Sequence, residues 1–419
     1  MDIATIQTTA TNNVQIVMFQ FLKRDSVLIN LMIILVAVSP AFALGEGNKN
    51  MLLIGVMCLS PYFLIRYPIV IPKVDMPLTI MCMMMISFPM VFHPETMRWS
   101  TVLYTCLFCL YFMAFARVLV VKVYDFTDFT QLLKGLIYAY CIILIVQQFC
   151  VLFGFPIFNV SNYTPLEPFK LNSLMSEPSH SARIIPILMF FYILAKEHEI
   201  GQKYVLKEQF TDDRKVWIAF LWPMLTMGSA TAFIFLLIII FKVFPSFKRA
   251  NTILVVIASL LIILTVASEN HNFDRAFRFS KAVLTLDEKQ IIKADGSGAH
   301  RIVQSFRGAR FVGLNDKDDW VGHGIDADQK LIPNWQSSYL PGGAGMFFLW
   351  VNYGFLACML WWCFSFHITL LNHEPLISTF IWLLTIFIMG GLNNQIIWLV
   401  LTISYCYKIL DNKFMIVYK

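Results

Sequence analysis

Charged residues are scarce in this chain of 419 residues. Asp, Glu, Lys and Arg make up 14% of it, whereas soluble domains contain about 25%. None of its nine cysteines lies in the polar stretch 269–344. The sequence also lacks a P-loop and a G-x-G-x-x-G segment. These absences argue against a soluble domain, a disulfide framework and a nucleotide-binding site.

Apolar residues fill most of the sequence instead, at 58% with a mean hydropathy of +0.67. They recur in runs of roughly 20 residues, the length that crosses about 30 Å of hydrocarbon. We therefore predict an all-α, polytopic membrane protein with about twelve transmembrane helices, at 27–44, 51–71, 76–92, 100–121, 132–155, 180–195, 216–228, 230–245, 252–268, 345–367, 376–391 and 393–410. Within 216–245, Gly228-Ser229-Ala230-Thr231 predicts a turn between two short helices, and one tilted helix is the alternative.

The basic residues predict the orientation of these spans. With both termini in the cytoplasm, eighteen of the 32 Lys and Arg face inward and four lie in short outer segments, as the positive-inside rule requires. The net charge of +6 therefore reflects the basic residues on the cytoplasmic side of the membrane. No nucleic-acid partner is expected. The predicted divisions are a cytoplasmic segment 1–26, nine helices in 27–268, a large periplasmic loop 269–344, three helices in 345–410 and a cytoplasmic tail 411–419.

Chemistry-bearing residues concentrate at the outer end of the sixth span. Glu177, His180 and Arg183 lie within seven residues, and a helix starting near Pro178 places Arg183 on one face with Ser179 or His180. An acid and a proline are also ordinary at a helix start. A stabilised helix N-terminus is therefore the alternative to an acid–base site.

The long outer loop contains a second group of candidates. Its arginines could bind an anion, because guanidinium holds two phosphate oxygens in fixed geometry; they are Arg275, Arg278, Arg301, Arg307 and Arg310. Pairing with the acids of the loop or with lipid headgroups is the alternative. His323, between Gly322 and Gly324, offers a flexible imidazole or a simple glycine turn. Helices are expected over 273–292 and 299–311.

The spans contain few polar groups away from their ends. Gln147, Gln148 and Asn352 are the clearest cases. An ion-coupled transporter normally needs buried charged residues in mid-membrane, so this class is disfavoured.

In this setting the chain resembles the O-antigen and exopolysaccharide polymerase family, including its colanic-acid-polymerase branch. The similar motifs are Leu174-Met175-Ser176-Glu177-Pro178-Ser179, the small-residue turn Leu225–Thr231, Ser297-Gly298-Ala299-His300-Arg301, Gly322-His323-Gly324 and Pro341-Gly342-Gly343-Ala344-Gly345. An Arg-x(10)-Gly spacing found in some polymerases is missing. The related ligases have a His before the tenth span, where this chain reads Gln336-Ser337-Ser338-Tyr339-Leu340.

The resemblance implies a membrane glycosyltransferase of the bacterial inner membrane. It would transfer a growing glycan from polyprenyl diphosphate to a lipid-linked repeat unit at the periplasmic face. Catalytic roles would fall to Glu177, His180, Arg301 and His323, and substrate binding to Arg183, Arg275, Arg278, Arg307 and Arg310. No cofactor or metal is expected, and the partners are the lipid-linked oligosaccharides, membrane lipids, a chain-length regulator and a flippase. The alternatives are a flippase or transporter, a ligase, and a membrane scaffold. The sugar, the linkage, the general base and the oligomeric state stay open.

Overall fold

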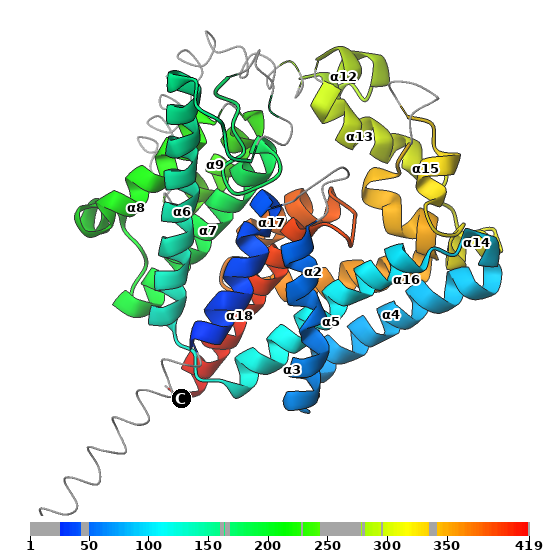
Figure 1. Ribbon diagram of the computed structural model, residues 1–419, viewed down its shortest axis with the longest axis horizontal. Helices are drawn as coiled ribbons and strands as arrows, with labels where there is room; N and C mark the ends of the chain where they lie inside the picture. Colours follow the sequence, from blue (N-terminus) through cyan, green and yellow to red (C-terminus); the bar gives the residue numbers. More distant parts are fainter. Residues whose placement is uncertain are drawn as a thin grey trace, which may run out of the picture.

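The computed structural model describes residues 26–42, 50–159, 163, 168–227, 229–243, 278, 281–294, 296–334 and 342–417. Every regular element in these ranges is a helix. The predicted all-α class is therefore confirmed for the described part of the chain (Figure 1).

The first half of the chain begins with the helical segment Ser26–Phe42, which ends in η1 (Ser39–Phe42). The elements that follow are α2 (Met51–Cys58), α3 (Ser60–Arg66), α4 (Pro72–Phe92), η2 (Pro94–Thr96), α5 (Trp99–Val121), α6 (Phe126–Phe153), α7 (Pro178–Ile200), α8 (Leu206–Thr226) and α9 (Ala230–Val243). The second half contains α12 (Glu288–Ala294), α13 (Gly296–Ala309), α14 (Lys317–Val321), α15 (Ala327–Leu331), η3 (Gly345–Phe347), α16 (Phe348–Thr369), α17 (Pro375–Trp382), η4 (Leu383–Phe387) and α18 (Gln395–Val417).

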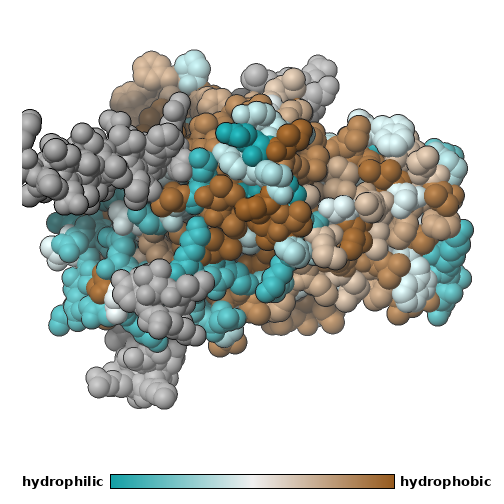
Figure 2. All heavy atoms as spheres, turned by 90° about the horizontal axis from the view of Figure 1, so that it is seen from below, coloured by the Kyte–Doolittle hydropathy of each residue, from teal (hydrophilic) through white to brown (hydrophobic). Residues whose placement is uncertain are grey.

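Five described helical segments are long and apolar enough to cross a membrane. They are α4, α5, α6, α7 and the combined η3–α16 segment Gly345–Thr369, and each coincides with a predicted span. The predicted spans 27–44, 51–71 and 376–391 correspond to shorter apolar helices, and 252–268 lies outside the described residues. Figure 2 shows hydrophobic residues over much of one face, with hydrophilic residues gathered toward its left and right margins. These features indicate a multi-pass membrane protein.

The described residues of the region 216–245 lie in two helices. α8 ends at Thr226 and α9 begins at Ala230, so the predicted break at the small-residue turn is confirmed. α8 begins at Leu206, well before the predicted start. Its first half is polar, which explains why a hydropathy window detects only the second half.

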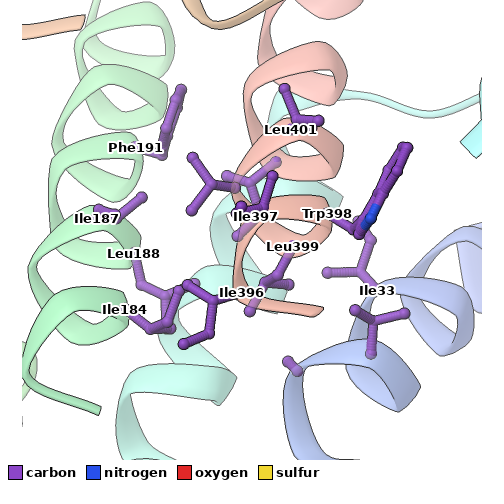
Figure 3. Close-up of a cluster of buried hydrophobic side chains, with 14 of the residues drawn as sticks. Ile33, Ile184, Ile187, Leu188, Phe191, Ile396, Ile397, Trp398, Leu399 and Leu401 are labelled. Carbon is purple, nitrogen blue, oxygen red and sulfur yellow. The ribbon is translucent and has the colours of Figure 1, made fainter. Parts of the chain in front are cut away.

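α18 lies between two groups of helices in Figure 1. One group, α6 to α9, packs together on one side, and α4, α5 and α16 pack on the other. α18 contacts α7 in the first group and α5 and α16 in the second. Figure 3 shows the α7–α18 packing, in which Ile184, Ile187 and Leu188 approach Ile396 and Ile397. These side chains are all fully buried, so close van der Waals packing joins the two groups.

Local sequence fixes both ends of α7. Glu177 is the N-cap residue with extended backbone, and Pro178 occupies the first helical position, where its missing N–H costs no hydrogen bond. Gly201 ends the helix in the left-handed conformation at φ +74°, which glycine adopts without strain. α7 and α18 each have 23 residues, or roughly 34 Å at about 1.5 Å per residue.

The helices α12 to α15 form a separate layer beside the ends of the long helices (Figure 1). The expected helix at 299–311 is confirmed, although α13 begins earlier, at Gly296. Within the expected helix 273–292 the described residues show a helical turn at 281–284 and then α12. α13 packs on η3, and α14 and α15 pack on α16, so this layer is held directly against the tenth predicted span.

Candidate functional site

Two cavities meet at the start of α7, and Glu177 and His180 line both of them. The first encloses about 370 Å³ and the second about 280 Å³. A carboxylate and an imidazole between two adjoining cavities can exchange a proton with molecules bound on either side. The structure therefore brings together two of the predicted catalytic residues.

Hydrogen bonds from two neighbouring serines orient the two side chains. His180 Nδ1 lies 3.1 Å from Ser176 Oγ, and its Nε2 lies 3.8 Å from the Glu177 carboxylate. The Ser179 hydroxyl donates to that same carboxylate at 3.1 Å. Glu177 makes no side-chain capping hydrogen bond to the α7 backbone. Helix capping alone therefore does not account for this glutamate.

The segment before α7 is anchored to α6 by polar contacts. Ser173 donates from its backbone N–H to Gln147 Oε1 at 2.8 Å and from its hydroxyl to the Tyr140 carbonyl at 2.6 Å. Asn159 Nδ2 donates to the carbonyls of Ser173 and Met175 at 2.9 and 2.6 Å. These bonds fix the backbone immediately before Ser176 and Glu177, and so they position the acid–base pair.

Amide side chains line the first cavity. Asn50 precedes α2, and Asn393, Asn394 and Gln395 precede or begin α18. Asn50 Nδ2 donates to Gln395 Oε1 at 3.0 Å. The Gln395 Nε2 atom is buried and has no hydrogen-bond partner among the described residues. Amides both donate and accept hydrogen bonds, as sugar hydroxyls do.

The second cavity lies between α7, α13 and the glycine-rich segment before α16. Gln304 of α13 lines it with Gly342, Gly343 and Gly345. Gln304 is 2% exposed, and both polar atoms of its side chain lack partners among the described residues. Burying an unsatisfied polar group costs about 1–3 kcal/mol, so this side chain is suited to a polar ligand.

A third, apolar cavity of about 400 Å³ lies beside the same region. It is lined by Phe42, Ile143, Val146, Cys150, Phe158 and Leu174, together with Gln147. Leu174 precedes the acid–base segment by two residues. An acyl or prenyl chain is the kind of group that such a lining accommodates.

Arg301 lies on α13, one helical turn before Gln304. The side chain of Arg301 lies outside the described part of the structure. Arg183 is in α7, one turn after Ser179, and is 4% exposed.

Among the described side chains, no predicted arginine lines any of the three cavities. Arg307 and Arg310 both contact Glu288, with nitrogen–oxygen distances of 3.2 and 2.9 Å, and Arg307 also donates to the Pro333 carbonyl at 3.0 Å. Arg307 and Arg310 therefore pair with an acid of the loop, which was the alternative to anion binding. Arg278 is exposed, and Arg275 lies outside the described residues.

His323 lies at the junction of the α12–α15 layer with α16. Its backbone N–H donates to the Val351 carbonyl at 2.8 Å. At Gly322, with φ +89°, a Cβ would approach the Asn352 carbonyl oxygen to 2.4 Å. The Gly-x-Gly motif therefore permits close packing here, and His323 lines neither cavity at Glu177.

The polar residues inside the predicted spans have structural partners. Gln147 binds the segment before α7, as described above. Gln148 accepts from Trp222 at 3.0 Å and donates to Thr226 at 2.9 Å, which joins α6 to α8. Asn352 pairs with Asp328 of α15. These three contacts do not form a continuous chain of polar groups along the bundle. An ion relay requires such a chain.

Sequence reasoning missed Gln304, Asn50 and the amides before α18. The run Asn393-Asn394-Gln395 at a predicted membrane boundary was a visible signal. Gln304 had a weaker signal, its position three residues after Arg301. Asn50 had none, because only the fold places it against Gln395.

Comparisons of the chain with protein-family models, with curated proteins and with solved structures give no match.

Proposed function

We propose that this protein is a polysaccharide polymerase of the bacterial inner membrane. It transfers a growing O-antigen, capsule or exopolysaccharide chain from polyprenyl diphosphate to a lipid-linked repeat unit at the periplasmic face. The observation that carries this proposal is the Glu177–His180 pair between two cavities at one end of an apolar helix bundle. A transferase that joins two lipid-linked sugars needs two adjoining sites with an acid–base group between them.

The residues that line the first cavity support the proposed topology of twelve spans with cytoplasmic termini. In that topology, Pro40, Asn50, Tyr104, Glu177 and Gln395 all fall at the outer ends of their spans. The first cavity brings the same five residues together. Gln304 of the predicted periplasmic loop lines the adjoining cavity, so loop and helix ends contribute to one outer site.

The proposed reaction is a direct displacement. A hydroxyl oxygen of the acceptor sugar attacks the anomeric carbon of the donor, and the bond from that carbon to the diphosphate oxygen breaks. Glu177, with His180 beside it, accepts the hydroxyl proton, and polyprenyl diphosphate departs with the bonding electrons. No nucleotide is consumed because the donor is already activated.

The two cavities fit the two substrates differently. The amide-lined cavity suits the acceptor, whose sugar hydroxyls pair with Asn50, Asn394 and Gln395. The cavity beside α13 suits the donor diphosphate, because Arg301 precedes Gln304 by one turn and guanidinium binds phosphate oxygens in a fork. The apolar cavity near Leu174 accommodates part of a prenyl chain.

A second candidate function follows from one contact. The 3.1 Å distance between Ser176 Oγ and His180 Nδ1, with Glu177 on the other ring nitrogen, is the arrangement of a serine nucleophile and its base. An acyl transferase with Ser176 as nucleophile would use it. Ser176→Ala separates the two functions: it abolishes transfer through Ser176, whereas a polymerase loses only the contact that orients His180. A serine-directed fluorophosphonate probe should label only the acyl transferase.

The polymerase proposal is tested in cells deleted for the gene and complemented with wild type, Glu177→Gln, Arg301→Lys or Arg301→Ala. Surface glycan is resolved on a gel at matched membrane levels of each variant. We expect the deletion and all three variants to leave single repeats in place of long chains. Arg301→Lys should fail although it keeps the charge, because lysine cannot form the bidentate fork.

Two matched controls accompany these variants. Glu199→Gln changes a glutamate at the other end of α7 that pairs with Lys196, and Arg214→Lys changes an exposed arginine of α8. Both should retain full-length glycan. Lipid-linked repeats trapped at the cytoplasmic face in the deletion strain would instead indicate a flippase, and unchanged glycan length would refute a role in polymerisation.

A further inference from the structure

A second group of chemistry-bearing residues lies at the opposite ends of α7 and α18. His198 is near the end of α7, Asp411 is near the end of α18, and His373 lies in the turn between α16 and α17. The three residues are far apart in the sequence. Because α7 and α18 both begin at the Glu177 cavity, this group is separated from it by most of the length of the two helices.

The three side chains converge on one point. His198 Nε2 lies 3.1 Å from Asp411 Oδ1, and His373 Nε2 lies 3.5 Å from Asp411 Oδ2. One ligand atom from each residue lies within 4.8 Å of the other two. Ligands at about 2.0–2.2 Å from a tetrahedral ion are roughly 3.4 Å from each other, so small side-chain adjustments would place all three around one ion.

Neighbouring groups hold the imidazoles in this orientation. The His198 ring stacks on Phe126 with centroids 4.2 Å apart and planes 9° apart. The Tyr407 hydroxyl lies 3.0 Å from His198 Nε2 and 3.2 Å from His373 Nε2. The Tyr407 hydroxyl contacts the same two nitrogens that face Asp411, so an ion bound between them would replace the hydroxyl on both rings.

The charges beside the group also favour a cation. Lys242 of α9 is buried and contacts Glu197 and Glu374, each at 2.7 Å. These glutamates are the sequence neighbours of His198 and His373. Lys242 therefore pairs with the carboxylates of Glu197 and Glu374. The carboxylate of Asp411 faces the two imidazoles instead.

We propose that His198 Nε2, His373 Nε2 and the Asp411 carboxylate bind one divalent transition-metal ion of the zinc class. Two imidazole nitrogens and a carboxylate oxygen suit Zn²⁺ and its neighbours, and disfavour Mg²⁺ and Ca²⁺, which prefer oxygen ligands. The ion joins the ends of α7 and α18 to the α16–α17 turn, so it stabilises the helix bundle at the face opposite the Glu177 cavities. This site does not depend on the proposed polymerase activity.

The test uses the full-length protein in detergent, purified through a tag without histidine and stripped with a chelator. Co²⁺ is titrated first, because its visible absorption reports nitrogen and oxygen ligation in a tetrahedral site. Zn²⁺ is then added in competition, and the thermal midpoint is followed by tryptophan fluorescence. The variants are His198→Gln, His373→Gln and Asp411→Asn, which keep polar side chains of similar size. His367→Gln is the control, since His367 is exposed on α16 outside the group.

We expect one Co²⁺ per chain with visible bands, displacement by stoichiometric Zn²⁺ and a higher thermal midpoint with metal. The bands and the midpoint shift should persist in His367→Gln and disappear in His198→Gln and Asp411→Asn. His373→Gln is the decisive variant because its side chain is 45% exposed, which limits any effect on folding. Wild-type protein that binds no Co²⁺ at tens of micromolar, or a His373→Gln variant that binds it as tightly as wild type, overturns the proposal.

Discussion

Asp328 and Asn352 bind each other reciprocally across the junction between α15 and α16. Asn352 Nδ2 donates to Asp328 Oδ1 at 2.8 Å, and the Asp328 backbone N–H donates to Asn352 Oδ1 at 3.1 Å. Both residues are buried. Burial raises the pKa of Asp328 above its ordinary value of 3.8, and this effect exceeds the lowering by the Asn352 hydrogen bond.

This pair predicts a pH dependence of stability. With a raised pKa, folded Asp328 keeps its proton at pH values where the unfolded chain has lost it, so the free energy of unfolding decreases as the pH rises from about 3.8 through the folded-state pKa. Asp328→Asn removes this dependence while an amide oxygen still accepts from Asn352. The thermal midpoint of the variant minus that of wild type should increase from acidic to neutral pH. A difference that stays constant with pH would contradict the assignment.

Tyr192 should contribute measurably to the contact between α7 and α8. Its hydroxyl donates to the buried Asp213 carboxylate at 2.6 Å, and Tyr204 donates to the other oxygen at 3.0 Å. Tyr192→Phe removes one donor to a buried charge, which should cost about 1.5–3 kcal/mol of unfolding free energy. Tyr62→Phe, at an exposed tyrosine, is the control and should have no effect. Denaturant unfolding in mixed micelles measures both.

Two glycine substitutions should have opposite effects. At Gly308 of α13 a Cβ would approach the Ala344 carbonyl oxygen to 2.5 Å, whereas at Gly135 of α6 nothing lies within 4 Å. Gly308→Ala should therefore destabilise the packing of α13 on η3. Gly135→Ala should stabilise α6 by up to about 1 kcal/mol through helix propensity. Limited proteolysis of the α12–α15 layer, compared with the global thermal midpoint, separates the two effects.

Gln304 should separate substrate binding from stability. Gln304→Met removes an amide whose polar atoms are buried without partners among the described residues, so the thermal midpoint should stay level or rise. If the proposed donor site is correct, glycan transfer should nevertheless decrease at least tenfold. Gln290→Met, at an exposed amide of α12, should change neither quantity. A Gln304→Met variant that is destabilised and fully active would assign Gln304 to structure alone.

Part of the candidate site was predictable because its residues are neighbours in the chain. Glu177 and His180 are three residues apart at a helix start, so their separation in the chain alone keeps the two side chains close together. The loop arginines were harder to predict. Arg307 shares α13 with Arg301 and Arg310 directly follows that helix, but the partner that binds both, Glu288, comes from a different helix. Composition cannot distinguish an anion site from an ion pair whose acid lies elsewhere in the fold.

The sequence by itself determined that this protein lies in lipid and that its secondary structure is helical. Too few charged residues and repeated apolar runs require helices that satisfy their own backbone hydrogen bonds in lipid, and small residues at 228–231 divide α8 from α9. Only the tertiary structure decided which helix ends meet. It placed Gln304 and Gln395 beside Glu177, and it brought His198, His373 and Asp411 together from three separate segments. The reason is that an apolar helix packs through van der Waals contacts that many neighbouring helices could supply. Hydropathy therefore identifies each span but not the helix that packs against it.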